Sequence, residues 1–177
     1  WLWANSPVNS LLTAVYFVSD QVGWAVGHDG MILHSQDSGQ SWSIQYNGLA
    51  LATDSGQKRV IETQARLKNA ESLLLAARAE GNNSIDLEFS RDDAKVALEL
   101  ALDAIDQPEA DPFMDIWFED QQHGIAVGAF GLIKRTEDGG KHWQDWSAQA
   151  DNEEGLHYYA MTANSNGQLL LAGEAGT

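Results

Sequence analysis

The chain has 177 residues, a formal net charge of −16 at pH 7 and no cysteine. A chain of this length can bury one sizeable core, and the lack of cysteine excludes disulfides and cysteine-based metal sites. Because an acidic surface repels phosphate backbones we expect no nucleic-acid partner, and because no run of 18 apolar residues occurs we expect no membrane-spanning helix in this segment.

The first 49 residues are predicted to form four short β-strands. Runs rich in β-branched and aromatic residues are separated by glycine-containing turns, which is typical of consecutive antiparallel strands. The expected strands are Ala14–Ser19, Gly23–Val26, Met31–Gln36 and Ser41–Tyr46.

An eight-residue motif, which we call the Asp-box, joins the last two of these strands over residues 35–42. Its pattern Ser/Thr-x-Asp-x-Gly-x-x-Trp is carried by Ser35, Asp37, Gly39 and Trp42. The aspartate can accept hydrogen bonds from N–H groups two residues on, and glycine adopts the positive φ that a tight turn needs. The tryptophan is a large apolar anchor for the next strand. We therefore interpret the Asp-box as a structural hairpin device, not a catalytic site.

Residues 50–110 differ in character and are predicted to form a helical hairpin. A seam with spacings of seven and three predicts a first helix over Gly56–Glu80, through Val60, Leu67, Ala70, Leu74 and Ala77. The turn Gly81–Asn83 ends it, and a capping-box pattern at Ser90–Asp93 opens a second helix to about residue 105. The apolar residues expected in that helix are Val96, Leu100 and Ile105. The alternation of Ile85–Phe89 is like that of a strand but too short to assign.

The four-strand pattern then recurs. Its second copy predicts strands at Met114–Glu119, Ile125–Val127, Leu132–Thr136 and Trp143–Trp146. A second Asp-box over residues 136–143 lies 101 residues after the first and contains Thr136, Asp138, Gly140 and Trp143. A third copy begins with strands at His157–Ala163 and Gln168–Ala172, and its Gly173 lies 45 residues after Gly128.

These spacings indicate a repeat of about 45 residues with about 56 residues inserted between the first two copies. A period in the forties with four short strands per unit is typical of a β-propeller. The predicted fold is therefore all-β, a segment of four-stranded propeller blades with an inserted α-helical hairpin. Residues 1–49 form a blade, 50–110 the hairpin, 111–150 a second blade and 151–177 part of a third.

The glycine-rich strands and the Asp-boxes resemble a known family. Val22–Ser35, followed by the first Asp-box, is similar to the photosystem II stability/assembly-factor-like propellers of the wider group with BNR (Asp-box) repeats. His123–Leu132 and Leu171–Thr177 look like the next blades of a non-photosynthetic bacterial branch. The resemblance covers about 115 residues and leaves out residues 50–110. The photosynthetic members share a basic, arginine-containing patch that this acidic chain does not match.

This resemblance implies a propeller of six or seven blades that is extracytoplasmic, either periplasmic or secreted. It implies a scaffold or assembly factor that needs no cofactor and binds protein partners, a membrane-associated complex among them. Two complete blades cannot close a ring, and open strand edges favour association. We therefore expect a longer native polypeptide or self-association through the open blade edges.

The order of the turns predicts which end of the blades acts. Strands in a blade alternate in direction, so the Asp-boxes, as third turns, lie on the face opposite the second turns. Loops on a rigid scaffold commonly carry function, and the variable second-turn residues expected to bind a partner are His28, Asp29, Phe130 and Glu174. The inserted hairpin is expected to project from the same face and to contribute. The alternatives are a solvated turn at His28 and Asp29, and a hairpin that only packs on its own blade.

The enzymatic alternative is a glycoside hydrolase, a sialidase-like enzyme with BNR repeats. Such an enzyme needs several arginines around the carboxylate of its substrate, because guanidinium groups pair with carboxylates bidentately. Arg135 is the only arginine in the repeats, so we expect no enzyme activity and assign no catalytic residue. The histidines lack metal-ligand spacing, and no metal is expected. Trp1, Trp3 and Trp146 are assigned no role.

Overall fold

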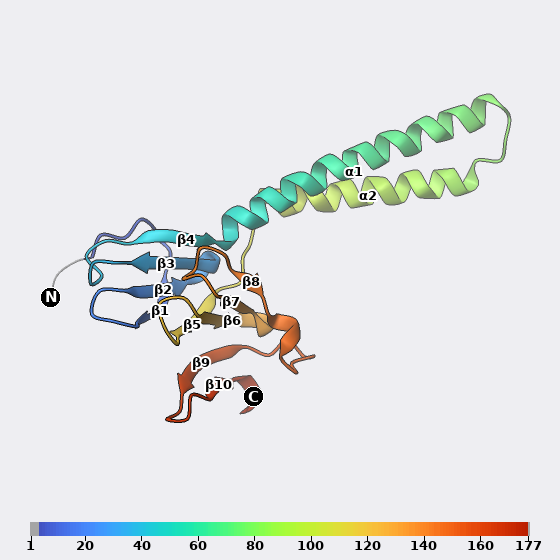
Figure 1. The fold of residues 1–177 in the computed structure, drawn as a ribbon. Helices are drawn as coiled ribbons and strands as arrows, with labels where there is room; N and C mark the ends of the chain where they lie inside the picture. Colours follow the sequence, from blue (N-terminus) through green and yellow to red (C-terminus); the bar gives the residue numbers. More distant parts are fainter. Residues whose placement is uncertain (1–3, 177) are drawn as a thin grey trace. The chain divides into compact units, whose positions relative to one another are not determined.

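A computed structural model describes residues 4–176 and divides the chain into two compact units. Of the described residues, one unit joins 4–49 to 110–176, and the other contains 50–109. The first unit contains all the β-strands, and the second contains almost all of two long helices (Figure 1). Trp1, Trp3 and Thr177, which the sequence analysis considered, lie outside the described residues.

The first sheet contains four antiparallel strands in the order β1-β2-β3-β4. They are β1 Leu12–Phe17, β2 Gly23–Gly27, β3 Met31–Ser35 and β4 Ser43–Asn47. The prediction of a four-stranded sheet is confirmed, although β1 begins two residues earlier and β4 two residues later than expected. Strand β2 is buried throughout, and its β-branched and aromatic residues fit a sheet covered on both faces.

The second sheet repeats this arrangement in the order β5-β6-β7-β8. Its strands are β5 Phe113–Phe118, β6 Gly124–Gly128, β7 Ile133–Thr136 and β8 Gln144–Asp145. Strand β8 is shorter than predicted because a side chain of the following segment, and not its backbone, accepts the next N–H of β7. The Ile133 N–H donates to Ser147 Oγ at 3.0 Å, and the Trp146 N–H donates to Ile133 O at 2.9 Å. A third, two-stranded sheet pairs β9 Tyr158–Ala163 with β10 Leu169–Gly173.

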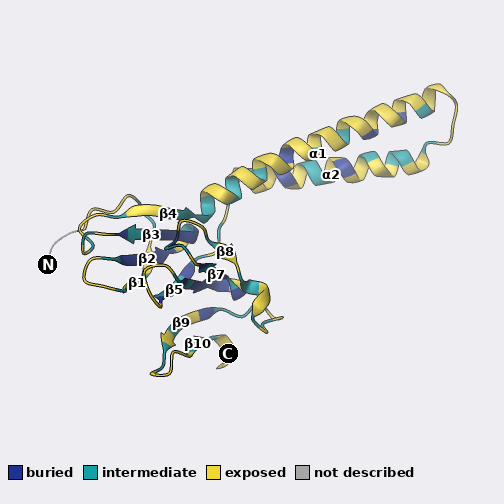
Figure 2. Ribbon diagram, viewed as in Figure 1, coloured by how far each residue is buried: buried dark blue, intermediate teal, exposed yellow. Residues whose placement is uncertain are grey.

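The main core lies where the first two sheets pack together. It is built from apolar side chains of both sheets: Trp24, Val26, Ile32, Phe113, Ile116, Phe118 and Ala126. A smaller cluster of Val127, Ile133 and Tyr158 joins the second sheet to β9. Figure 2 shows the buried segments in dark blue along β2 and β3. Burying these large side chains between adjacent sheets is the principal favourable contribution to the stability of this unit.

Polar contacts also join neighbouring sheets. Gln45 on β4 accepts the indole N–H of Trp24 at 2.9 Å and donates its own amide to Gly139 O at 2.9 Å. Asp115 on β5 accepts the Met161 N–H of β9 at 2.6 Å. Since these groups are partly buried, breaking either contact would leave a polar group without a partner, and the bonds therefore help to define the spacing of the sheets.

The helices form a hairpin, with α1 over Gly48–Ala79 and α2 over Ile85–Asp106. The residues buried between them are Val60, Ala70 and Leu74 of α1 and Ala94 and Ala101 of α2. The buried positions of α1 agree with the predicted seam. Small residues let the helices approach closely: a Cβ at Gly56 would lie 2.7 Å from Ile105 Cγ2. Neither helix in the described part of the chain has the length and apolarity to cross a membrane.

Both helices begin earlier than the sequence predicts. Helix α1 starts at Gly48 rather than Gly56, because no proline interrupts the chain after β4. Gly56 therefore lies inside the helix, where the close approach of Ile105 explains the glycine. Helix α2 starts at Ile85, where Asn83 Oδ1 accepts the Ile85 N–H at 3.2 Å. The strand-like segment 85–89 is therefore helical, and the capping box predicted at residues 90–93 lies inside the helix.

The side of α2 that faces α1 also differs from the prediction. Val96 and Leu100, expected in the seam, are 54% and 65% exposed. Ala94 and Ala101 are buried instead. A close-packed interface between two helices admits small side chains where the axes approach, so the alanines occupy the seam and the larger residues are left outside it.

Candidate partner-binding surface

The first Asp-box closes the turn between β3 and β4 with side-chain hydrogen bonds. Ser35 Oγ donates to Asp37 Oδ1 at 2.9 Å and accepts the Gly39 N–H at 2.9 Å. Asp37 accepts the Ser41 N–H at 2.9 Å and the Ser41 hydroxyl at 2.6 Å. The carboxylate thus receives the N–H four residues on, not two residues on as the motif suggested, because it spans the whole turn. Trp42 donates its indole N–H to Gly39 O at 3.1 Å.

The second Asp-box repeats this geometry between β7 and β8. Thr136 Oγ1 donates to Asp138 Oδ1 at 2.9 Å and accepts the Gly140 N–H at 2.9 Å. His142 donates its backbone N–H to Oδ1 at 3.0 Å, and its Nδ1 lies 2.6 Å from Oδ2. Gly140 has a φ of 85°, which favours glycine. Trp143 packs edge-on against Phe118, with ring centroids 6.0 Å apart.

Hydrogen bonds keep both Asp-box carboxylates ionised. The hydrogen bond from the Ser41 hydroxyl lowers the pKa of Asp37 most, and the bond from the Ser41 N–H is the second cause. Hydrogen bonds from the backbone and then the side chain of His142 lower the pKa of Asp138 to about 2. A carboxyl group that stays ionised at neutral pH cannot donate a proton as a general acid. The hydrogen bonds that these carboxylates accept close the two hairpin turns.

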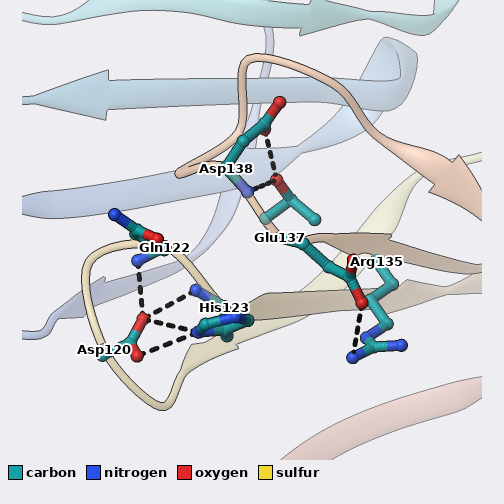
Figure 3. A network of polar contacts seen from close by, with 7 residues as sticks. Asp120, Gln122, His123, Arg135, Glu137 and Asp138 are labelled. Atoms are coloured by element: carbon teal, nitrogen blue, oxygen red, sulfur yellow. Dashed lines mark hydrogen bonds and ion pairs between the residues drawn. The ribbon is translucent and has the colours of Figure 1, made fainter.

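A carboxylate–imidazole pair occupies the neighbouring turn between β5 and β6 (Figure 3). Asp120 Oδ1 accepts the N–H groups of Gln122 at 2.6 Å and His123 at 2.8 Å, and His123 Nδ1 lies 2.9 Å from Oδ2. The side chain of His123, followed by the two backbone donors, lowers the pKa of Asp120 to about 2. The hydrogen bond to Asp120 raises the pKa of His123. The Gly139 N–H donates to Gln122 O at 2.9 Å, so the first and third turns of this sheet are neighbours.

The Asp120–His123 pair predicts a pH-dependent contribution to stability. With the carboxyl pKa lowered, its stabilisation is present above 3.8 and lost as the pH falls toward 2. With the imidazole pKa raised, its stabilisation is complete below 6.5 and lost as the pH rises through the folded-state value. His123→Gln should therefore lower the melting temperature most at about pH 5 to 6, and only slightly because the pair is exposed.

Circular dichroism melts of both proteins from acid to alkaline pH would measure this difference. Nuclear magnetic resonance titration of His123 should show an imidazole pKa above 6.5. A melting-temperature difference that stays constant across the range would contradict the assignment of the effect to the pair.

At the other end of the sheets, the second turns are short 3₁₀ segments that share one backbone conformation. They are η1 His28–Gly30, η2 Ala129–Gly131 and η4 Glu174–Gly176. Their central residues have positive φ angles, which are uncommon outside glycine: Asp29 at 60°, Phe130 at 53° and Ala175 at 54°. The backbone conformation of the second turn is thus the same in the three repeats, whereas the side chain at its tip differs.

Phe130 belongs to a surface that crosses from η2 to β9 and η4. Its ring packs on the imidazole of His157 with centroids 4.7 Å apart, and His157 lies parallel to Tyr159 at 6.2 Å. Glu174 Oε2 accepts the His157 N–H at 3.3 Å and lies 3.8 Å from His157 Nε2. Phe130 is 64% and Tyr159 53% exposed. We call these four residues (Phe130, His157, Tyr159 and Glu174) the aromatic–acidic surface.

The four residues predicted to bind a partner lie in two separate parts of the surface. Phe130 and Glu174 come together through His157. His28 is exposed on η1, and Asp29 accepts the Ser10 hydroxyl at 2.6 Å. Across residues 4–176, no hydrogen bond, ion pair or ring contact joins His28 or Asp29 to the aromatic–acidic surface.

Sequence reasoning missed the contributions of His157 and Tyr159. The pattern places His157 at the start of a strand, whereas its carbonyl accepts the N–H of the second-turn residue Glu174 at 2.8 Å. The equivalent carbonyls of Leu11 and Pro112 accept the same bond in the first two sheets. Aligning this position across the repeats would have located His157 beside a second turn. Its contact with Phe130 depends on how neighbouring sheets pack.

The remaining polar side chains of this unit include those around a hollow beside the second Asp-box. Within the described range 4–176, no group of three or more histidine, aspartate and glutamate side chains is arranged to hold a metal ion. A polar hollow of about 280 Å³ contains His34, Lys141 and a single carboxylate, that of Asp138. Glycosidases generally require two carboxyl groups flanking the bond they cleave, and this hollow presents one.

Comparison with known proteins relates the chain to one family. The profile of the family described as "Photosynthesis system II assembly factor YCF48" matches residues 94–175. The match starts inside α2 and leaves out the first sheet, which the sequence resemblance had included. The "Photosystem II assembly lipoprotein Ycf48" of Synechococcus sp. (strain CC9902) is 37% identical over 75 residues, 41% of this chain and 22% of the relative. The protein of the same name from Parasynechococcus marenigrum (strain WH8102) is 36% identical over 58 residues, 33% of this chain and 17% of that protein.

Two solved structures share the fold. "YCF48 bound to D1 peptide" has a TM-score of 0.53 and 15% identity, with 96% of this chain and 37% of that chain covered. "YCF48 from Cyanidioschyzon merolae" has a TM-score of 0.52 and 12% identity, with 98% and 38% covered. The four-stranded sheets therefore resemble YCF48 propeller blades. The chain spans less than half the length of these relatives.

Proposed function

We propose that this chain acts as a non-catalytic propeller scaffold, like an assembly factor, and binds a protein partner through the aromatic–acidic surface. The observation that carries the proposal is the exposure of two aromatic rings, Phe130 and Tyr159, which both neighbour His157 beside a carboxylate. Aromatic residues are enriched at protein interfaces because they offer a large contact area at low entropic cost. The short turn also holds Phe130 in place before binding, which reduces the cost of ordering.

A peptide segment of the partner suits this surface. Phe130 and Tyr159 can pack against apolar or aromatic side chains, and Glu174 can pair with a basic residue. One solved structure of similar fold is titled as bound to a D1 peptide, which supports peptide recognition as a property of such blades. We extend the proposal to His28 and Asp29 as a second contact, and to the helical hairpin as an additional surface.

The acidic composition of the blades supports the proposal that the partner differs from that of the photosystem II assembly proteins. Their only basic residues are Lys134, Arg135 and Lys141, which supports placing the chain in the non-photosynthetic bacterial branch. The relatives from Synechococcus and Parasynechococcus are named as lipoproteins. We accordingly propose an extracytoplasmic location at a membrane for this chain, with a membrane-associated complex as the partner.

Selection of a random peptide library displayed on phage against the intact chain tests the binding surface. Peptides that the unmodified chain retains should bind the double variant Phe130→Ala, Tyr159→Ala about tenfold or more weakly, because the exposed rings supply the contact. Fluorescence anisotropy with the selected peptides and with the D1 peptide of the solved relative would measure the loss. Since both side chains are exposed, the melting temperature should be almost unchanged.

Val15→Ala is a matched control, since Val15 is 61% exposed on β1 and lies outside the aromatic–acidic surface. This variant should bind the selected peptides as the unmodified chain does. Peptides that bind the double variant with undiminished affinity would refute the surface. Hydrolysis of a glycoside by the purified chain would refute the non-catalytic assignment.

A further inference from the structure

Helix α2 has a second apolar face that nothing in the described structure covers. Ile85, Phe89, Val96 and Leu100 are 57%, 67%, 54% and 65% exposed. With 3.6 residues per turn, their side chains fall within an arc of about 60° and form one line along the helix. We call these four residues the α2 stripe. Figure 2 shows the exposed segments of α2 in yellow.

The α2 stripe is separate from the seam of the hairpin. Ala94 and Ala101 are buried against α1, and at 100° per residue they lie on the opposite side of the helix from the stripe. A surface helix normally has one apolar face, which points to the core. Because α2 has two apolar faces, one is available for a further contact.

The α2 stripe has an acidic border. Of the exposed carboxylates on the same half of the helix, Asp86, Asp92, Asp93 and Glu99 flank the line, and Asp103 follows Leu100 at its C-terminal end. Asp92 pairs with the neighbouring Arg91 at 2.6 Å. Within residues 4–176 the other four carboxylates form no ion pair. An apolar line with unpaired carboxylates on its margins is complementary to a helix that has an apolar face and basic margins.

We propose that the α2 stripe docks a cationic amphipathic helix of a partner protein. The proposal rests on the scaffold function above and names the chemistry of the partner that the hairpin binds. Packing of α2 against the same helix of a second copy would oppose two acidic borders, which is unfavourable. An anionic membrane surface would be repelled for the same reason.

Helix α1 offers a pair of exposed apolar residues that do not lie on one line. Its exposed apolar residues include Ile61 and Leu73, which lie about 120° apart around the helix. They provide a matched control, because they are as exposed as the stripe residues but do not form one face.

The test measures binding of fluorescein-labelled synthetic helices to the intact chain by anisotropy. The main probe is a peptide of about 18 residues with leucine along one helical face and lysine elsewhere, long enough for helix formation on the protein. A scrambled peptide of the same composition removes the apolar face, and a leucine–glutamate peptide reverses the charge. The amphipathic lysine peptide should bind about tenfold or more tightly than either, and raising the salt concentration should weaken its binding.

Variants then locate the binding. Phe89→Ser with Leu100→Ser should weaken binding of the lysine peptide about tenfold, whereas Ile61→Ser with Leu73→Ser should leave it within about twofold. Asp93→Asn with Asp103→Asn should weaken binding and reduce its salt dependence. Circular dichroism checks that each variant keeps its helical content. Equal binding of the scrambled peptide, or an unchanged affinity in the Phe89/Leu100 variant, would overturn the proposal.

Sedimentation separates the proposal from self-association. A dimer of the unmodified chain that the Phe89/Leu100 variant abolishes would identify a second copy as the occupant and overturn the proposal. The two binding surfaces are also distinguishable. The Phe130/Tyr159 variant should still bind the lysine peptide, and the Phe89/Leu100 variant should still bind the phage-selected peptides. Failure at one surface with binding at the other therefore refutes only the corresponding proposal.

Discussion

Replacing Trp24 with alanine is expected to lower the free energy of unfolding by about 3 to 5 kcal/mol. Trp24 is completely buried, and its ring stacks on Phe118 of the second sheet with centroids 3.4 Å apart. On its own sheet it stacks on His34 at 5.0 Å. The substitution leaves a cavity at the contact between two sheets and removes the N–H that Gln45 accepts. Both changes are destabilising.

Urea unfolding followed by circular dichroism would measure this loss. Trp24→Phe should be less destabilising, because a smaller ring still fills part of the site. Val15→Ala, at an exposed position on β1, should change the unfolding free energy by less than about 0.5 kcal/mol. A loss below about 1 kcal/mol for Trp24→Ala would mean that the sheets are not held together through this ring.

Gly128→Ala is expected to destabilise the fold by about 3 kcal/mol, at the upper end for overpacking, or to prevent folding. Gly128 has a φ of −166°, an extended conformation open to any residue, so the effect is steric. A Cβ there would collide with the carbonyl oxygen of Pro112, which accepts the Ala129 N–H at 3.1 Å. A backbone carbonyl cannot rotate away as a side chain can. Gly27 meets the Leu11 carbonyl in the same way.

Thermal and urea unfolding of the Gly128 variant, compared with Gly81→Ala, would separate sterics from backbone conformation. Gly81 has a φ of 73°, and a Cβ added there would have no other atom within 4 Å, so alanine there should cost only about 1 to 2 kcal/mol. Because Gly128 begins the turn that presents Phe130, its variant should also bind phage-selected peptides more weakly. A Gly128→Ala protein as stable as the unmodified chain would contradict the collision.

Folding and binding use different residues of the same repeat. The buried strands β2 and β6 and the Asp-boxes hold the sheets, and they vary little between the copies. The tip of the second turn is Asp29, Phe130 or Ala175 in the three copies, with the same backbone conformation in each. A rigid repeat with a variable tip can change its partner without changing its fold.

The strands were predictable because their apolar residues recur with turns at regular spacing. Strand β8 ended one residue earlier than predicted because the Ser147 side chain enters the ladder beside Ile133. Such a contact leaves no periodic signal in the sequence. The hairpin shows a stronger limit: spacing alone could not decide which apolar line of α2 faces α1.

For the candidate site, the sequence pointed to Phe130 and Glu174 through the position of the second turns. It did not reveal that His157 joins them or that Tyr159 extends the surface, since those residues belong to the following repeat. Their meeting depends on the packing of neighbouring sheets. The roles of Phe130 and Tyr159 in binding are predictions that the peptide-binding experiment addresses, and those of His157, Glu174, His28 and Asp29 stay predictions.

Local patterns were enough to predict the repeats, the Asp-box turns and the presence of a two-helix insertion. Hydrogen bonds within eight residues close an Asp-box, and the spacing of apolar residues defines a strand or a helix. Which side chains from distant segments share a surface depends instead on how the folded elements pack. The alanines at 94 and 101 fit the close approach of the helices better than Val96 and Leu100, so the larger residues became the α2 stripe. Which residues of α2 lie in the seam therefore depends on how the two helices pack, and no local sequence pattern encodes that packing.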